Sequence, residues 1–144
     1  MATFSSLEEA REHFKKDQFA SFSGMVLDEL GEDYSVCSVQ LGEVHQNAYG
    51  GIMGGAIFTL ADLAFAALSN NIHQPTVAQQ VSINYLSSVK GQKLIARATM
   101  KKDGKRTCTI VVDVTDDTGR LFFRGRNKSK ANAFRFPEKP QSRK

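Results

Sequence analysis

The sequence has little of several residue types, and each shortage excludes a class of protein. Its two cysteines stand far apart in 144 residues, with no CxxC pair and no paired histidines, so we expect neither a disulfide framework nor a metal site. We predict that Cys37 and Cys108 are buried thiols in a reducing compartment. No apolar run is long enough to span a bilayer, and the longest, 54–68, contains an aspartate. The first residues lack a basic start followed by an apolar run, so we expect a cytoplasmic protein without a secretory signal.

The first part of the chain has few basic residues, and the second part has few acidic ones. Residues 1–89 carry three basic and ten acidic side chains, a net charge of −7, whereas residues 90–144 carry sixteen and five, a net charge of +11. Two interpretations stay open: the basic half binds an anionic partner, or its side chains solvate the outer faces of strands. A net charge of only +4, an acidic N-terminal helix and the lack of tryptophan speak against nucleic acid as that partner.

Hydrophobic periodicity predicts an α+β fold. An amphipathic helix is expected over about 6–20, starting with the capping box Ser6–Glu9. Two strands follow, broken near Gly31, and the pattern does not decide which face of the second is buried. A second helix, apolar nearly all round, begins near Ala56 and is typical of a central buried helix. The expected strands cover residues 24–32, 34–43, 77–86, 93–101, 106–115 and 121–128, and we interpret the last four as a meander.

These elements fit one antiparallel sheet wrapped around a single long helix. We divide the chain into an N-terminal helix and lead-in over 1–23, a domain over 24–136 and a tail over 137–144. The tail is polar and charged, so we expect it to be disordered.

Asp62 is the first candidate for chemistry. It lies in the middle of the apolar helix, with no cation between Lys16 and Lys90. A carboxylate in such surroundings should have a raised pKa, which suits a general base or a nucleophile. The alternative is a structural carboxylate satisfied by a hydroxyl group, by water or by a distant lysine.

A glycine-rich loop, with Gly50, Gly51, Gly54 and Gly55, leads into the same helix. Free N–H groups at a helix N-terminus can stabilise an oxyanion or bind an anion. The alternative is an ordinary tight turn between helix and sheet. Gly54 and Asp62 are about 12 Å apart along one helix, so one reacting carbonyl cannot touch both. Two antiparallel helices from two subunits could share the site, which predicts a homodimer or a dimer of dimers.

The run from Asn47 to Asp62 resembles the motif N-x-x-G-x-x-H-G-G-x-x-x-x-L-x-D of hotdog-fold thioesterases of the phenylacetic-acid-degradation type. The segments 83–86, 102–106 and 116–121 also resemble strands and turns of that family. The resemblance implies a hotdog fold and a site built from both subunits of a dimer. It implies that Asp62 is the catalytic carboxylate, that the Gly54 N–H polarises the thioester carbonyl, and that Asn47 orients the reacting groups.

Two residues depart from the family pattern. Met53 replaces the usual histidine before the glycine pair, and Ala78 stands where many relatives carry Ser or Thr. His45 and His73 are interpreted as surface loop histidines without a catalytic role. The alternative to an active enzyme is therefore a noncatalytic or weakly active acyl-CoA-binding protein of the same fold.

The function that the resemblance implies is hydrolysis of an acyl-CoA to a free acid and CoA, with no cofactor, metal, membrane or nucleic-acid partner. The side chains or backbone that we expect around the acyl group belong to Tyr49, Met53, Gly55, Phe58 and Phe65. The basic side chains that could meet the CoA phosphates are Lys90, Lys102, Lys105, Arg106, Arg124 and Arg126.

Overall fold

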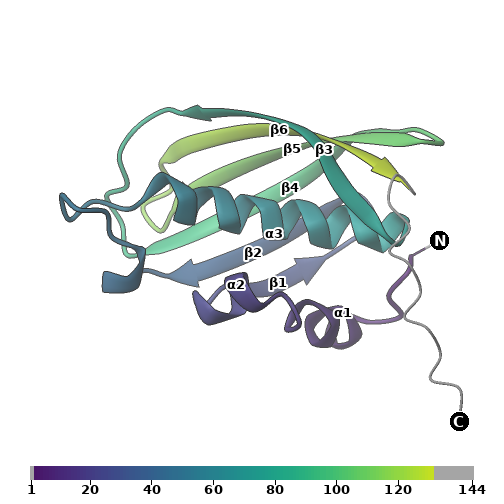
Figure 1. Ribbon diagram of the computed structural model, residues 1–144, viewed down its shortest axis with the longest axis horizontal. Helices are drawn as coiled ribbons and strands as arrows, with labels where there is room; N and C mark the ends of the chain where they lie inside the picture. Colours follow the sequence, from purple (N-terminus) through teal and green to yellow (C-terminus); the bar gives the residue numbers. More distant parts are fainter. Residues whose placement is uncertain (1, 132–144) are drawn as a thin grey trace, which may run out of the picture.

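The computed structural model describes residues 2–131, which form an antiparallel sheet with one long helix across it (Figure 1). The elements are α1 (Leu7–Phe14), α2 (Gln18–Phe22), β1 (Val26–Leu30), β2 (Tyr34–Gln40), the 3₁₀ turn η1 (Glu43–His45), α3 (Gly54–Ile72), β3 (Thr76–Tyr85), β4 (Lys93–Asp103), β5 (Thr107–Asp116) and β6 (Leu121–Ala131). The predicted sheet around a central helix is confirmed. The predicted tail, 137–144, and the end of the predicted domain, 132–136, lie outside the described residues.

The described strands are ordered β1-β2-β4-β5-β6-β3, and all neighbours are antiparallel. The predicted meander is therefore wrong for β3, which pairs with β6 and not with β4. Tight hairpins join β4, β5 and β6, but the longer connection 86–92 leads from β3 at one edge to β4 in the middle of the sheet. The alternation of residues along a strand predicts which side chains share a face of the sheet, but it does not predict which strands pair. As a result β3 has one open edge among the described residues.

Helix α3 supplies one side of the core. Leu60, Ala64 and Leu68 recur at helical spacing, are completely buried, and face the sheet residues Leu94 and Val112. The helix is long and apolar enough to cross a membrane by length and composition alone. Its burial against the sheet accounts for that composition without a membrane.

Strand β2 is buried on both faces, which explains why alternation does not indicate its inner side. All residues from Ser35 to Val39 are buried. The Ser35 hydroxyl donates a hydrogen bond of 2.6 Å to the Ala64 carbonyl oxygen of α3, and Cys37 belongs to the hydrophobic core. Burial raises the pKa of the Cys37 thiol, so this thiol is protonated and inert.

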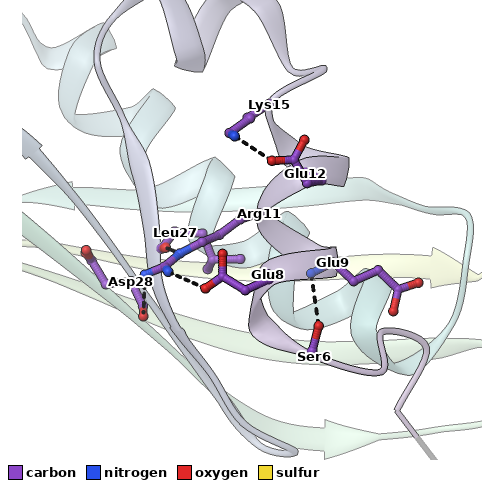
Figure 2. A network of polar contacts seen from close by, with 8 residues as sticks. All are labelled: Ser6, Glu8, Glu9, Arg11, Glu12, Lys15, Leu27 and Asp28. Carbon is purple, nitrogen blue, oxygen red and sulfur yellow. Dashed lines mark hydrogen bonds and ion pairs between the residues drawn. The ribbon is translucent and has the colours of Figure 1, made fainter.

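The single predicted N-terminal helix is two helices. The first begins as predicted, because the Ser6 hydroxyl caps it by accepting the Glu9 N–H. It ends before Asp17, whose carboxylate accepts the Ala20 N–H and caps α2. Arg11 holds α1 against β1 by donating to the Leu27 and Asp28 carbonyl oxygens (Figure 2). This anchor fixes the corner between α1 and α2 beside α3.

A buried carboxylate ties two loops together at one end of the sheet. Asp116 is 1% exposed and accepts N–H bonds from Lys90 at 3.2 Å, Gly91 at 3.0 Å and Thr118 at 3.0 Å. The Thr118 hydroxyl also donates to it. The Thr118 hydroxyl, and then the backbone N–H groups, stabilise the charged form and lower the pKa of Asp116 to about 2.

Asp116→Asn is expected to cost about 2 kcal/mol of unfolding free energy at pH 7, because the amide cannot accept the same bonds as the anion. Since the folded pKa is depressed, this contribution is complete above about pH 4 and is lost as the pH falls towards 2. Urea unfolding of both proteins from pH 7 to pH 2.5 measures it. Asp117→Asn is the control, since exposed Asp117 accepts one N–H bond, from Gln92. A gap between parent and Asp116→Asn that does not narrow below pH 4 would contradict this assignment.

Candidate active site

The loop before α3 is folded by the side chain of Asn47. Its Oδ1 accepts hydrogen bonds from the Tyr49 N–H at 2.9 Å and the Gly51 N–H at 3.1 Å. The Asn47 N–H donates to the Gly51 carbonyl oxygen at 2.7 Å, and Gly50 turns the chain with a φ of 79°. The oxygen of the Asn47 amide is thus used by the loop, and its NH₂ group has no partner among residues 2–131.

His45 is buried, so its interpretation as a surface loop histidine is wrong. Its Nδ1 accepts the Gly42 N–H at 3.0 Å, and its Nε2 lies 2.8 Å from the Ser23 carbonyl oxygen. A carbonyl oxygen only accepts, so the proton is assigned to Nε2. The ring joins the loop before α3 to the end of α2 and has no free nitrogen for chemistry. His73 is exposed, as predicted.

The first turn of α3 presents free donors. The Met53 N–H donates to the His45 carbonyl oxygen at 2.9 Å, and the Met53 carbonyl oxygen accepts the Ala56 N–H at 3.0 Å. Met53 is the N-cap and makes no side-chain capping bond. The N–H groups of Gly54 and Gly55 are the first two of the helix and have no acceptor within it. They lie at the positive pole of a long helix, where a developing negative charge is stabilised.

Asp62 lies on the face of α3 that points away from the sheet, and it is half-buried. No hydrogen bond or ion pair joins its carboxylate to any residue in the described range. Burial raises its pKa, and the negative charge of Asp17 raises it further. The helix therefore holds a carboxylate that is ready to accept a proton above the usual range of an aspartate.

Within one chain, the free N–H groups and this carboxylate do not meet. Gly54 and Asp62 are eight residues apart on a straight helix, about 12 Å. Between and beyond them the outward face of α3 carries Phe58 and Ala66, which are only half-buried. One chain thus contains both halves of a site, separated along an apolar helix face.

Comparison with known proteins identifies the family. The family model described as the thioesterase superfamily matches residues 49–123, which include the start of α3, Asp62 and strands β3 to β5. The chain belongs to the thioesterase superfamily. Its sheet wrapped around α3 is the hotdog fold of its structural neighbours.

This thioesterase is 33% identical over 96 residues to acyl-coenzyme A thioesterase 13 of Homo sapiens, covering 64% of this chain and 69% of the human one. It is 25% identical over 123 residues to acyl-coenzyme A thioesterase PaaI of Escherichia coli, covering 83% and 88%. A solved structure, a hypothetical thioesterase protein with coenzyme A from Streptococcus pneumoniae, superposes with a TM-score of 0.76 at 25% identity, over 83% of this chain and 94% of that one.

The apolar candidates of the thioesterase site have different surroundings. Tyr49 is 98% exposed at the tip of the loop, Met53 is 56% exposed, and Gly55 is exposed beside it. Phe58 is half-buried on the outward face of α3. Phe65 is 2% exposed and belongs to the core between α3 and the sheet. The first four therefore border the start and the outer face of α3, while Phe65 supports the helix from beneath.

The basic candidates do not gather in one place within a chain. Lys90 precedes β4, at the same end of the sheet as the start of α3. Lys102, Lys105 and Arg106 lie at the turn between β4 and β5, at the opposite end. Arg124 is paired with Asp113, its Nε 2.7 Å from the Asp113 Oδ1, on the sheet face away from α3. Arg126 pairs through its backbone with Ser82 and Val111, and its side chain is outside the described part.

Two residues at this site were not found by sequence reasoning. Asp17 acts on Asp62 from the corner between α1 and α2, and Tyr85 at the end of β3 contacts Gly54. No pattern of neighbouring residues indicates either role, because Asp17 is far from Asp62 in the sequence and Tyr85 is far from Gly54. No group of three or more His, Cys, Asp or Glu side chains within residues 2–131 could hold a metal ion.

Proposed function

We propose that this thioesterase hydrolyses acyl-CoA thioesters to a free acid and CoA, with Asp62 as the proton-accepting or nucleophilic carboxylate. The observation that carries the proposal is a carboxylate that has a raised pKa and no partner among residues 2–131, on the same helix whose first two N–H groups have no acceptor in that range. The two relatives named as acyl-coenzyme A thioesterases and the neighbour solved with coenzyme A support the choice of substrate.

The chemistry follows from these groups. As a base, Asp62 takes a proton from water while the water oxygen bonds to the thioester carbon. As a nucleophile, its oxygen bonds to that carbon instead. In both routes the carbonyl oxygen becomes negative and accepts a hydrogen bond from the Gly54 N–H of the other subunit. The C–S bond then breaks, and CoA leaves as a thiolate that takes up a proton. The base route gives the free acid directly, whereas the nucleophilic route leaves an anhydride on Asp62 that water then cleaves.

The proposal includes a homodimer with two shared sites. If Gly54 of one helix faces Asp62 of an antiparallel partner helix, then position 58 faces its own copy at the two-fold axis. The half-buried Phe58 and Ala66 provide an apolar surface for such a contact. The open edge of β3 offers unpaired backbone groups that a second copy could also use. The contact between the two helices would complete the site, and pairing at the β3 edge could accompany it or build a dimer of dimers.

Binding of acyl-CoA without efficient turnover is the second candidate. Met53 supports it, because an exposed thioether stands at the N-cap of α3 and offers no hydrogen-bond donor to a substrate. A cytoplasmic location is also part of the proposal, and a reduced Cys37 thiol is consistent with it.

A panel of acyl-CoAs of increasing chain length tests the function, with released thiol followed continuously. We expect hydrolysis of at least one member, and saturable binding of free CoA that weakens as salt is added, because residues 90–144 carry a net charge of +11. Calorimetry at low and high salt measures the binding. Binding of acyl-CoA without thiol release would favour the noncatalytic candidate, and absence of both would reject the substrate class.

A further inference from the structure

The start of α3 is held by the side chain of Tyr85, the last residue of β3. The Tyr85 hydroxyl of β3 donates a hydrogen bond of 3.0 Å to the Gly54 carbonyl oxygen. The Tyr85 ring is 53% exposed and packs edge-on against buried Phe123, with 5.4 Å between ring centroids. A Cβ added at Gly54 would lie 3.3 Å from the Tyr85 ring and hydroxyl, a tight contact that would press on this side chain.

Three consecutive peptide groups are fixed around the free donors. The peptide before Met53 is held by its N–H, which bonds to the His45 carbonyl oxygen. The next is held by the Met53 carbonyl oxygen, which accepts the Ala56 N–H. The third contains the Gly54 carbonyl oxygen and the Gly55 N–H, and the contact that reaches it from outside the helix is the Tyr85 hydroxyl.

A hydrogen bond to a carbonyl oxygen affects the N–H of the same peptide. It fixes the plane of the peptide, and it draws electron density towards oxygen, which makes the N–H a stronger donor. We propose that Tyr85 is a positioning residue, which orients and polarises the Gly54–Gly55 peptide so that its N–H supports the oxyanion beside that of Gly54. The oxyanion role rests on the proposed thioester hydrolysis, whereas the effect of Tyr85 on the peptide does not.

Tyr85→Phe removes the hydroxyl and keeps the ring against Phe123. We expect kcat for the best acyl-CoA to fall about 3- to 10-fold, the worth of one net hydrogen bond, while KM stays unchanged and the melting temperature falls by a few degrees at most. The split between kcat and KM separates positioning from substrate binding, because a lost binding contact raises KM instead. Tyr34→Phe is the matched control, since the ring of Tyr34 contacts Arg97 and its hydroxyl makes no hydrogen bond in the described structure.

A second readout does not depend on activity. In protein labelled with ¹⁵N-glycine, the Gly55 amide proton is expected to move upfield in Tyr85→Phe and to stay in place in Tyr34→Phe. Unchanged kcat, a loss confined to KM, or an unmoved Gly55 signal would each overturn the role of Tyr85. A parent protein that hydrolyses no acyl-CoA would overturn the proposed function instead, and the Gly55 signal would still decide whether Tyr85 acts on this peptide.

Discussion

Asp62→Asn is expected to lower kcat for acyl-CoA hydrolysis about 10²- to 10⁴-fold, the usual loss when a general base is removed. Asparagine keeps the size of the side chain but accepts no proton and does not attack a carbonyl. Stability should be unchanged or higher, because burial and Asp17 both disfavour the ionised carboxylate and raise its pKa. Thiol release measures the loss of activity, a melting curve measures stability, and CoA affinity shows whether binding is retained. All three are measured on the same preparation.

The pH dependence of the rate provides a control for the role of Asp62. Only ionised Asp62 is active in either route, so the rate should fall as the pH drops through the pKa of Asp62. Because that pKa is raised, this fall should occur at a higher pH than for an ordinary aspartate. Asp17→Asn keeps the cap of α2, since asparagine caps as well as aspartate, but it removes the like charge. We expect it to move this acid limb to lower pH with activity retained. Full activity in Asp62→Asn would reject Asp62 as the reacting carboxylate, and an acid limb that Asp17→Asn leaves in place would reject the contribution of Asp17 to its pKa.

Phe58→Glu is expected to produce a monomer with at least about 100-fold less activity. In the proposed dimer, position 58 faces its own copy at the two-fold axis, so the change sets two carboxylates against each other in an apolar contact. Each Asp62 then loses the N–H donors of the partner helix, and loss of such a donor costs about 10²- to 10³-fold in kcat. Light scattering gives the mass, and thiol release gives the activity.

The control for this variant is Val26→Glu. Val26 is 52% exposed on β1, at the edge of the sheet opposite to β3, and the same kind of change there should leave both mass and activity as they are. Phe58 also borders the proposed acyl site, so activity alone does not decide the matter. An active monomeric parent, or a Phe58→Glu protein that keeps the parent's mass, would contradict the shared site.

The periodicity of neighbouring residues in the sequence was sufficient to predict helix α3, which carries Asp62, and the three strands that follow β3. Strand alternation and turn residues predicted β4, β5 and β6 closely, and the all-round apolar run predicted the buried α3 with Asp62 in it. The spacing of eight residues between Gly54 and Asp62 was enough to expect a second subunit, because helical rise is fixed by backbone hydrogen bonding. All of these depend on neighbours in sequence, which is where periodicity carries information.

The tertiary structure alone decided which distant residues meet. Pairing of β3 with β6 and not β4 depends on how the sheet closes over α3, and it brings Tyr85 to Gly54 across 31 positions of sequence. Burial of His45 between η1 and the end of α2 has the same origin. The raised pKa of Asp62 was expected from its apolar neighbours, but the contribution of Asp17 arises from a helix corner anchored through Arg11. The residue type determines the chemical character of each side chain, whereas the packing of segments that are remote in sequence determines the partners on which its chemistry depends.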